Sequence, residues 1–313
     1  MKIRYGTRGS ALALAQSGQF AEELARGRPG LEVERVVIQT SGDRFSLARP
    51  RAAAGAEPEN VKAMFVKELE EALLAGTIDF AVHSSKDLPG ELPPGLVVAA
   101  FPQRADPWDV YIGSPRAPRW RDIQAGTGLR VATAALRRQI QLKLSAPGLG
   151  FMVMRGNVDT RLRKLGEGAA DGLILAKAGL ERLGRCNVPH EVLPLELIVP
   201  APGQGALAVE ARADRKDVLE LLAGVDHAAT RLEVECERLF LRLMGGGCRT
   251  PLGAWARSRE GGIDFQWFWS DLEGRNPRRG SCSCARDLSV FQTLAAELAG
   301  RLRNEDASPG GKP

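Results

Sequence analysis

Residues 64–83 read MFVKELEEALLAGTIDFAVH, and this stretch decides the fold class. Phe65, Leu69 and Leu73 recur with the spacing of one helix face, so we expect a helix over the first half of the stretch. The apolar run that follows, residues 78–83, predicts a buried strand. A helix that leads into such a strand is the repeating unit of α/β proteins.

The same alternation continues outward in both directions. Upstream, a strand at residues 3–6 leads into a helix that Ser10 would cap at its N-terminus, and a strand at residues 33–38 follows. Downstream, strands are expected at residues 110–112, 130–133, 151–155, 172–175 and 206–211, with helices that start near residues 136, 158 and 178. We therefore predict an α/β architecture with parallel or mixed sheets.

The C-terminal part follows a different pattern. We expect a long helix through Leu243, two strands around Trp255 and residues 265–269, and a final helix over residues 288–302. This arrangement indicates a smaller α+β unit. Since 313 residues exceed what one hydrophobic core usually supports, two or three domains are expected.

The composition argues against several classes of function. Hydrophobic residues make up 44% and charged residues 26%, as in ordinary globular proteins. No apolar run is long enough to span a bilayer, and the N-terminus enters a strand pattern without a signal-peptide core. We therefore expect a cytoplasmic protein with no membrane partner. Acidic residues are interspersed with the basic ones and aromatics are 5%, so no nucleic-acid partner is expected.

The five cysteines are an odd number, and Cys282 and Cys284 have the wrong spacing for a zinc knuckle or a redox pair. We expect neither a disulfide framework nor a metal site. Cys248 stands out, because residues 243–251 read LMGGGCRTP and glycine runs let the backbone approach a ligand closely. Arg249 beside it would favour the reactive thiolate, although a small apolar residue at a turn is the alternative interpretation.

Charged side chains recur at one topological position, the carboxyl end of a predicted strand. They comprise Arg8, the segment HSSKDLP at residues 83–89, Arg137 with Arg138, and the segment RGNVDTR at residues 155–161. Ligands of open α/β sheets usually bind in the crevice at these ends. Several arginines that converge there would neutralise a ligand with several carboxylates.

The segment 41–60 has little apolar content and contains two prolines. A loop of this length inside a compact domain is usually a functional lid or disordered. We interpret it as a mobile cover, with disorder as the alternative.

Seven motifs occur in one order along the chain. They are TRGS at 7–10, FVKEL at 65–69, HSSKDLP at 83–89, LRRQ at 136–139, RGNV at 155–158, APGQGA at 201–206 and GGC at 246–248. In this order the chain resembles the porphobilinogen deaminase (hydroxymethylbilane synthase) family. The resemblance covers most of the chain and thins in the loop before Val61 and after Trp255.

The resemblance implies three domains, two of them α/β domains like those of periplasmic binding proteins that flank a cleft, plus a smaller α+β C-terminal domain. Domain 1 would comprise residues 1–101 and 199–217, domain 2 residues 102–198, and domain 3 residues 218–313. Domain 1 would supply the catalytic aspartate and the mobile loop, domain 2 an arginine-rich face, and domain 3 the cysteine that carries the cofactor.

The implied activity is that of a transferase of tetrapyrrole synthesis. It would condense four porphobilinogen molecules head to tail into hydroxymethylbilane and release ammonia. A dipyrromethane cofactor, attached by a thioether to Cys248, would prime the reaction. A monomer is expected, with porphobilinogen as its small-molecule partner. The arginine pattern agrees, because each ring carries an acetate and a propionate.

The resemblance also assigns roles to individual residues. Asp87 would be the catalytic residue, because a carboxylate can stabilise a pyrrole cation and relay protons. Cofactor-binding residues would be Cys248, Lys86, Ser84, Arg137, Arg138, Thr133, Arg155 and Gly247. Substrate-binding residues would be Arg8, Ser10, Arg155, Arg161, Lys62 and Phe65.

The sequence departs from the family pattern in two places. Ala132-Thr133-Ala134-Ala135 stands where the family usually has Gly-Thr-Ser-Ser, so two hydroxyls that would bond cofactor carboxylates are missing. The stretch before Phe65 also lacks the usual glycines.

Three alternatives stay open: a catalytically degenerate paralogue, a two-lobed binding protein for a polycarboxylate, and a metal protein built on Cys236, Cys248, Cys282 and Cys284. The metal protein is the least favoured, because Cys236 falls on a helix and fits a core position. The pairing of Cys248 with Asp87 argues against a binding protein without catalysis.

Overall fold

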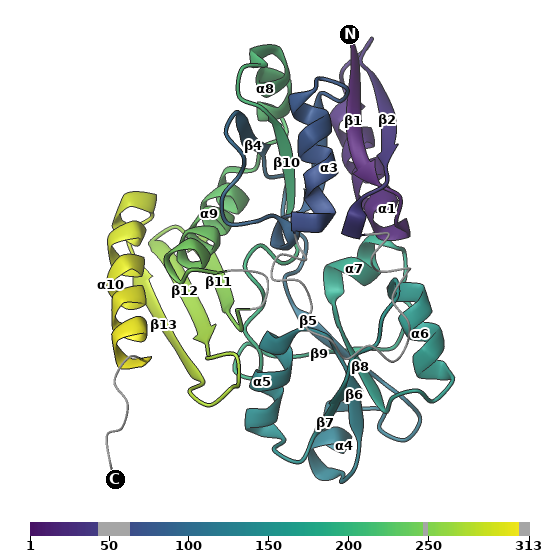
Figure 1. The fold of residues 1–313 in the computed structure, drawn as a ribbon, viewed down its shortest axis with the longest axis vertical. Coiled ribbons are helices and arrows are strands. Elements are labelled where there is room, and N and C mark those ends of the chain that lie inside the picture. Colours follow the sequence, from purple (N-terminus) through teal and green to yellow (C-terminus); the bar gives the residue numbers. More distant parts are fainter. Residues whose placement is uncertain (43–62, 247–249, 307–313) are drawn as a thin grey trace.

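The computed structural model describes residues 1–42, 63–246 and 250–306, which form three sheets with their helices (Figure 1). The first sheet contains β1 (Lys2–Arg8), β2 (Glu32–Ile38), β3 (Phe80–Ser84), β4 (Leu96–Ala100) and β10 (Leu207–Arg212). Its order is β2-β1-β3-β10-β4. β1 runs parallel to β2 and β3, whereas β10 runs antiparallel to β3 and β4.

The second sheet repeats this pattern. It contains β5 (Asp109–Gly113), β6 (Arg130–Ala132), β7 (Gly150–Met152), β8 (Gly172–Ala176) and β9 (Glu191–Val192), in the order β7-β6-β8-β5-β9. β6 runs parallel to β7 and β8, and β5 runs antiparallel to β8 and β9. In each sheet the antiparallel strand is the first strand after a crossing from the other sheet. The chain crosses twice, between β4 and β5 and between β9 and β10.

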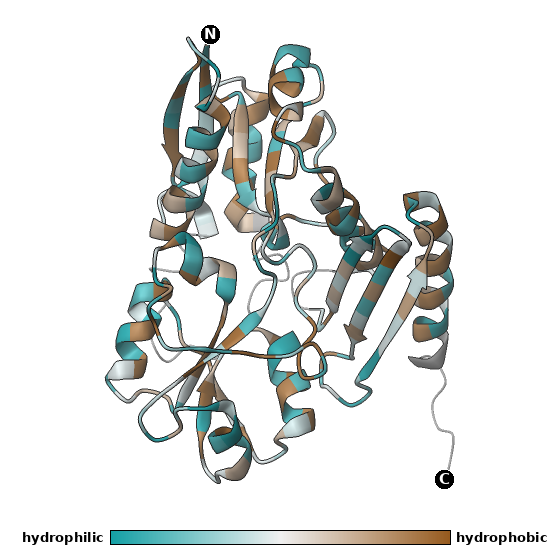
Figure 2. Ribbon diagram, turned by 180° about the vertical axis from the view of Figure 1, so that it is seen from behind, coloured by the Kyte–Doolittle hydropathy of each residue, from teal (hydrophilic) through white to brown (hydrophobic). Residues whose placement is uncertain are grey.

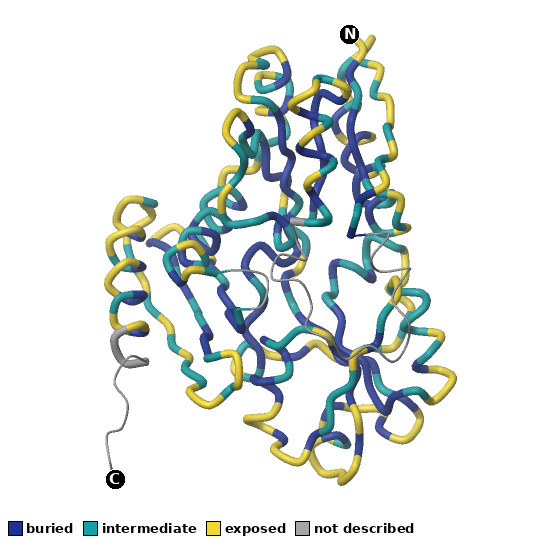
Figure 3. Tube along the Cα trace, in the orientation of Figure 1, coloured by how far each residue is buried: buried dark blue, intermediate teal, exposed yellow. Residues whose placement is uncertain are grey.

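Helices cover both faces of the first sheet. α1 (Ala11–Ala25) and α8 (Lys216–Ala223) pack on one face, where Phe20 and Leu222 join a core with Phe80. α3 (Ala63–Leu74) packs on the other face through Leu69 and Leu73. The buried chain mainly follows the inner strands, and many exposed residues lie on loops and helices (Figure 3). The helices carry both hydrophilic and hydrophobic residues along their length (Figure 2).

Helices α4 (Trp120–Ala125), α5 (Leu136–Ser145), α6 (Val158–Gly166) and α7 (Lys177–Arg182) surround the second sheet. α7 also reaches the first domain, because it contacts α1 and the Gln19 amide donates to the Arg182 carbonyl oxygen over 3.2 Å. The carboxyl ends of the parallel strands in the first sheet lie on the side that faces the second sheet (Figure 1).

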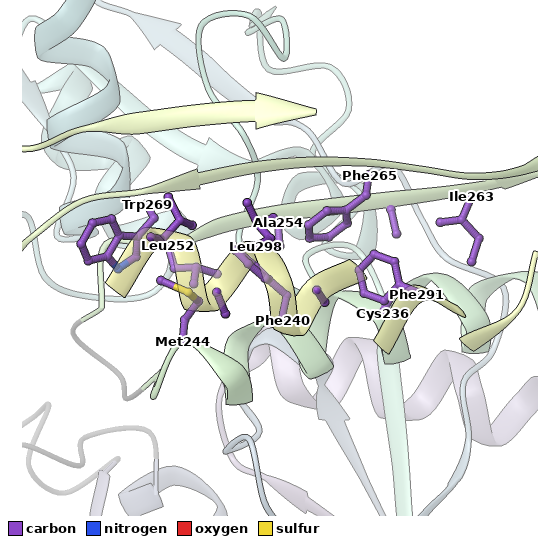
Figure 4. Packing of buried hydrophobic residues seen from close by; sticks show 14 residues of the cluster. Cys236, Phe240, Met244, Leu252, Ala254, Ile263, Phe265, Trp269, Phe291 and Leu298 are labelled. Atoms are coloured by element: carbon purple, nitrogen blue, oxygen red, sulfur yellow. The ribbon is translucent and has the colours of Figure 1, made fainter. Parts of the chain in front are cut away.

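The third unit packs two helices on an antiparallel sheet. Its elements are α9 (Ala228–Leu243), β11 (Gly253–Arg259), β12 (Gly262–Trp269), β13 (Arg278–Cys284) and α10 (Leu288–Asp306). Phe265 lies between Phe240 and Phe291, with ring centroids 5.3 and 4.9 Å apart, and buried Cys236 belongs to the same cluster (Figure 4). The core position expected for Cys236 is confirmed, and so is the three-domain α/β fold class.

One buried carboxylate links both crossings to this third unit. Glu237 on α9 accepts hydrogen bonds from Arg104 Nη1 and Nη2, at 2.7 and 3.1 Å, in the first crossing. It also accepts from Gly203 N at 2.6 Å in the second crossing and from Ala256 N at 2.9 Å on β11. The position of the third unit is therefore coupled to the connections between the two lobes.

Some expected elements differ from the observed ones. The strand predicted at residues 151–155 is only β7, because exposed Val153 leaves the sheet. The sequence prediction missed β13, which reads RRGSCSC and has no apolar run. Among the described residues, no helix is long and apolar enough to cross a membrane.

Candidate functional site

A pocket lies at the carboxyl ends of β1 and β3, which are parallel neighbours and so end at the same edge of the sheet. It is open to solvent, and its volume is about 410 Å³ when the open space at its mouth is included. Its lining includes Arg8, Ser10, Gln16, Phe65, Ser84 and Asp87. The structure thus brings together four predicted substrate- or cofactor-binding residues and the predicted catalytic residue.

Local structure explains how the pocket walls are fixed. Ser10 caps α1, as expected, since its hydroxyl accepts a hydrogen bond from Ala13 N at 3.3 Å. The Arg8 guanidinium lies 4.1 Å from the centroid of the Phe65 ring, a cation–π distance. The Ser84 hydroxyl donates to Gln16 Oε1 at 3.0 Å. These contacts place a cation and polar side chains around one opening.

Asp87 closes the short 3₁₀ turn Ser85–Asp87 that follows β3. Its side chain is half-buried, and within residues 1–42, 63–246 and 250–306 it accepts no hydrogen bond and forms no ion pair. A carboxylate that lines a pocket without a protein partner can accept hydrogen bonds from a ligand. Beside it, burial lowers the pKa of Lys86 to about 8, with Asp87 opposing this shift. Lys86 can therefore exchange a proton near neutral pH.

Arg137 and Arg138 lie at the start of α5 and share one buried partner, Asp109 at the start of β5. Arg137 Nη1 lies 2.8 Å from Asp109 Oδ2, and Arg138 donates to Asp109 Oδ1 from Nε at 2.9 Å and from Nη2 at 2.6 Å. Burial opposes ionisation of Asp109, but the two guanidinium groups hold its pKa well below the ordinary value. Two cations on one carboxylate leave one net positive charge, which suits an anionic ligand. The same groups act electrostatically on Lys86, so the predicted cofactor-binding cations converge.

Three other predicted residues belong to the lobe of the second sheet: Thr133 follows β6, Arg155 follows β7, and Arg161 lies on α6. Arg161 donates from Nε to the Gly156 carbonyl oxygen at 2.8 Å, and burial and Arg138 lower its pKa. Arg155 is half-buried, and its carbonyl oxygen accepts from Lys164 Nζ at 3.0 Å. Thr133 is buried.

The departure at Ala134 and Ala135 has a local consequence. Ala135 is the N-cap residue of α5 and offers no side-chain acceptor to the helix. A serine hydroxyl at such a position would satisfy one free N–H group of the first helical turn or bond a ligand carboxylate.

Several predicted residues lie outside the described ranges. They are Cys248 and Gly247 of the glycine-rich segment, Lys62, and residues 43–60 of the expected mobile cover. The described start of that segment contacts α3, because Ser41 N donates to Glu68 Oε1 at 2.7 Å. The thioether assignment to Cys248 stays a prediction.

Sequence reasoning missed three residues of this region. Gln16 lies on the α1 face that bonds Ser84, two turns beyond the TRGS motif. Asp109 is an acidic residue at the start of an otherwise apolar strand, a pattern that often indicates a buried ion pair. Arg182 donates to the Gly205 carbonyl oxygen at 2.6 Å, and burial lowers its pKa to about 10. No local motif marks Arg182.

The chain matches two family models. They are described as "Porphobilinogen deaminase, dipyromethane cofactor binding domain", over residues 3–220, and "Porphobilinogen deaminase, C-terminal domain", over residues 231–302. The porphobilinogen deaminase of Syntrophus aciditrophicus is 43% identical over 300 residues, covering 96% of this chain and 94% of that protein. The porphobilinogen deaminase of a Roseiflexus species is 44% identical over 296 residues, covering 94% of each chain.

Partial matches also occur among solved structures. The methionine-binding protein MetQ has 14% identity and a TM-score of 0.44, covering 74% of this chain and 92% of that chain. The VFT2 domain of Bordetella pertussis BvgS has 14% identity and a TM-score of 0.40, covering 71% of this chain and 84% of that chain.

Proposed function

The chain belongs to the porphobilinogen deaminase family, and from this we propose that it condenses four porphobilinogen molecules head to tail into hydroxymethylbilane. The observation that carries the proposal is the Asp87 carboxylate, which has no partner among the described residues and lies in a pocket whose rim holds Arg8 and Ser10. A pyrrole that bears two carboxylates needs cations for its side chains and an acceptor for its N–H group. Both kinds of group face this opening.

The positively charged side chains of the site fit a dipyrromethane cofactor, whose rings carry acidic groups. Asp109 neutralises only one of the two charges on Arg137 and Arg138, so this buried pair keeps an excess positive charge for acidic side chains. Lys86 lies within electrostatic reach of the same pair. When bound through Cys248, the cofactor supplies the terminal pyrrole that is extended.

The chain's own residues do the following work. Arg8 and Ser10 hold the acetate and propionate of the incoming porphobilinogen, with Phe65 orienting the guanidinium. Asp87 accepts the pyrrole N–H of the substrate while the carbon–nitrogen bond of its aminomethyl group breaks and ammonia leaves. The resulting pyrrole cation is stabilised by the negative charge of Asp87. After the new carbon–carbon bond forms, Asp87 takes up the proton that the attacking pyrrole loses from its α-carbon as the ring regains aromaticity.

In the proposed domain division, the pocket belongs to residues 1–101 and 199–217, the arginine pair to residues 102–198, and Cys248 to residues 218–313. We also propose a cytoplasmic monomer that acts on a small molecule, with no nucleic-acid or membrane partner. The family membership does not favour a degenerate paralogue or a binding protein without catalysis.

The test is turnover of porphobilinogen by Asp87→Asn. Asparagine keeps the size and one acceptor oxygen but removes the charge, so we expect turnover to fall ~100-fold or more in a folded protein. Asp214→Asn is the control, because Asp214 is an exposed partner of Arg212. An Asp87→Asn protein that releases ammonia at the wild-type rate would overturn the assignment.

A further inference from the structure

Three ionisable side chains are buried together beside the pocket. Glu70 lies on α3, His83 on β3 and Glu210 on β10, and their exposed fractions are 9%, 5% and 0%. His83 Nε2 lies 3.1 Å from Glu210 Oε2. The proposed reaction uses none of the three.

The strand register explains why these groups meet. β10 runs antiparallel to β3, with Ala208 opposite His83 and Glu210 opposite Ala81. Glu210 and His83 are thus diagonal neighbours on one face of the sheet. Ala81 on this face packs against Leu69 of α3, and Glu70 is the next helical residue. Glu70 acts electrostatically on both Glu210 and His83.

The cluster is costly as a purely structural element. Glu70 Oε1, both carboxylate oxygens of Glu210 and His83 Nε2 are buried and make no hydrogen bond with the described residues. His83 and Glu210 therefore meet as a close contact between an imidazole and a carboxylate, without hydrogen-bond alignment. Most buried polar atoms in native proteins are bonded. Apolar residues would often be equally or more stable at such positions, so buried charges of this kind call for a role other than stability.

The charges around the cluster come from several elements. Arg238 on α9 interacts electrostatically with Glu210, and Glu71 on α3 acts weakly on Glu70. Burial, and then the charge of Glu210, raise the pKa of Glu70 to about 7. Glu70 can therefore carry a proton near neutral pH.

His83 of the cluster and its neighbour Arg238 lie at the two ends of the turn that presents Asp87. On the entry side, the pairing of β3 with β10 continues past His83 to Ser84, and Ser85 N donates to the Ala206 carbonyl oxygen at 3.0 Å. On the exit side, Arg238 Nη2 donates to the Pro89 carbonyl oxygen at 2.8 Å. The turn between these points contains no other long-range backbone hydrogen bond among the described residues.

We propose that Glu210 is a positioning residue for the proposed reaction: its ion pair with His83 fixes the end of β3 and so the placement of the Asp87 carboxylate. The proposal rests on the function proposed above. The proposal predicts that loss of the pair lowers kcat and leaves KM nearly unchanged. Loss of the pair displaces Asp87 relative to the reacting bond, whereas Arg8 and Ser10 stay on β1 and α1 and keep their hold on the substrate.

The test compares Glu210→Gln with Glu71→Gln in the full-length holoenzyme. Glu71 is the matched control, because it lies on the same cluster-facing helix but is exposed and, in the part of the chain that the structure describes, forms its ion pair with Lys67 alone. For Glu210→Gln we expect kcat to fall ~10–100-fold with KM within about twofold, since small displacements of a catalytic group have effects of this size. Glu210→Asp, which restores the charge, should recover part of kcat. An unchanged kcat, or equal losses with Gln and Asp, would overturn the proposal.

His83→Asn keeps the test decisive if Glu210→Gln fails to fold, because it removes the other partner of the pair and should reproduce the loss of kcat at constant KM. Where Glu210→Gln does fold, the double variant should lose little more than either single variant. If the losses of kcat in the two single variants added in the double variant, His83 and Glu210 would act independently and the proposal would be refuted. Turnover by the wild-type and Glu71→Gln proteins separates the two claims: if both are inactive on porphobilinogen, the proposed function fails rather than the positioning role.

Discussion

Asp109→Asn is the change whose outcome follows most directly from the geometry. Asp109 is fully buried and is the shared counter-charge of Arg137 and Arg138; it also accepts from Gln204 Nε2 at 3.0 Å. The substitution leaves two buried guanidinium groups without a negative partner among the described residues. Removal of one partner from a buried ion pair costs about 3–5 kcal/mol. Because asparagine retains one acceptor oxygen, we expect a loss near the lower end, ~3 kcal/mol.

Urea unfolding at pH 7 measures this loss. With a denaturant slope of about 3 kcal/mol/M, the unfolding midpoint should fall by roughly 1 M. The difference should shrink with acidity: the pKa of Asp109 is depressed in the folded protein, so its stabilisation is present above its unfolded pKa and is lost as the pH falls. Asp106→Asn is the matched control, since that exposed carboxylate pairs with Lys177 at the surface. An Asp109→Asn protein with the wild-type midpoint would show that the carboxylate is not the counter-charge of the arginine pair.

Two further predictions concern binding and pH. Arg138→Leu should reduce the amount of covalently loaded cofactor seen by mass spectrometry. Arg8→Leu should leave the cofactor in place and raise KM for porphobilinogen. Identical mass profiles and kinetics for both variants would contradict this difference between the two arginines. Burial raises the pKa of Glu70 to about 7, above the ~4.3 of an unfolded glutamate, so the folded state binds more protons between these values and stability falls as the pH rises through them. Glu70→Gln should lack that fall and gain on the order of 2–3 kcal/mol relative to wild type by pH 8, measured by urea unfolding across pH; parallel curves for the two proteins would contradict it.

The sequence predicted the elements whose signal is local. The helix with Leu69 and Leu73, the strand before Asp87 and the Ser10 cap all depend on spacing or on one residue type at a chain reversal. Parallel strands bring their carboxyl ends together, so the meeting of Arg8 with Asp87 followed from fold class alone. β13 escaped prediction because its residues are small and polar, and it is held by pairing with β12.

The parts of the site that sequence could not supply depend on non-local pairing. Arg137 and Arg138 were expected to face a ligand, yet both also bind Asp109, which lies 29 residues before Arg138 in the chain. Glu210 and His83 meet only because β10 returns from the second lobe and pairs with β3. The spacing of residues along the sequence cannot predict such contacts, because they depend on how strands from distant parts of the chain pair.

The central claim, a covalently primed porphobilinogen deaminase, is tested most directly by the intact mass of the purified protein. The account predicts a mass above that of the chain by two porphobilinogen units less two ammonia molecules, and a Cys248→Ser protein without this addition, because an alcohol is a far weaker nucleophile than a thiolate. The same change at buried Cys236 should leave the addition in place. An adduct that persists in Cys248→Ser, or a wild-type protein that turns over porphobilinogen without any adduct, would contradict the account.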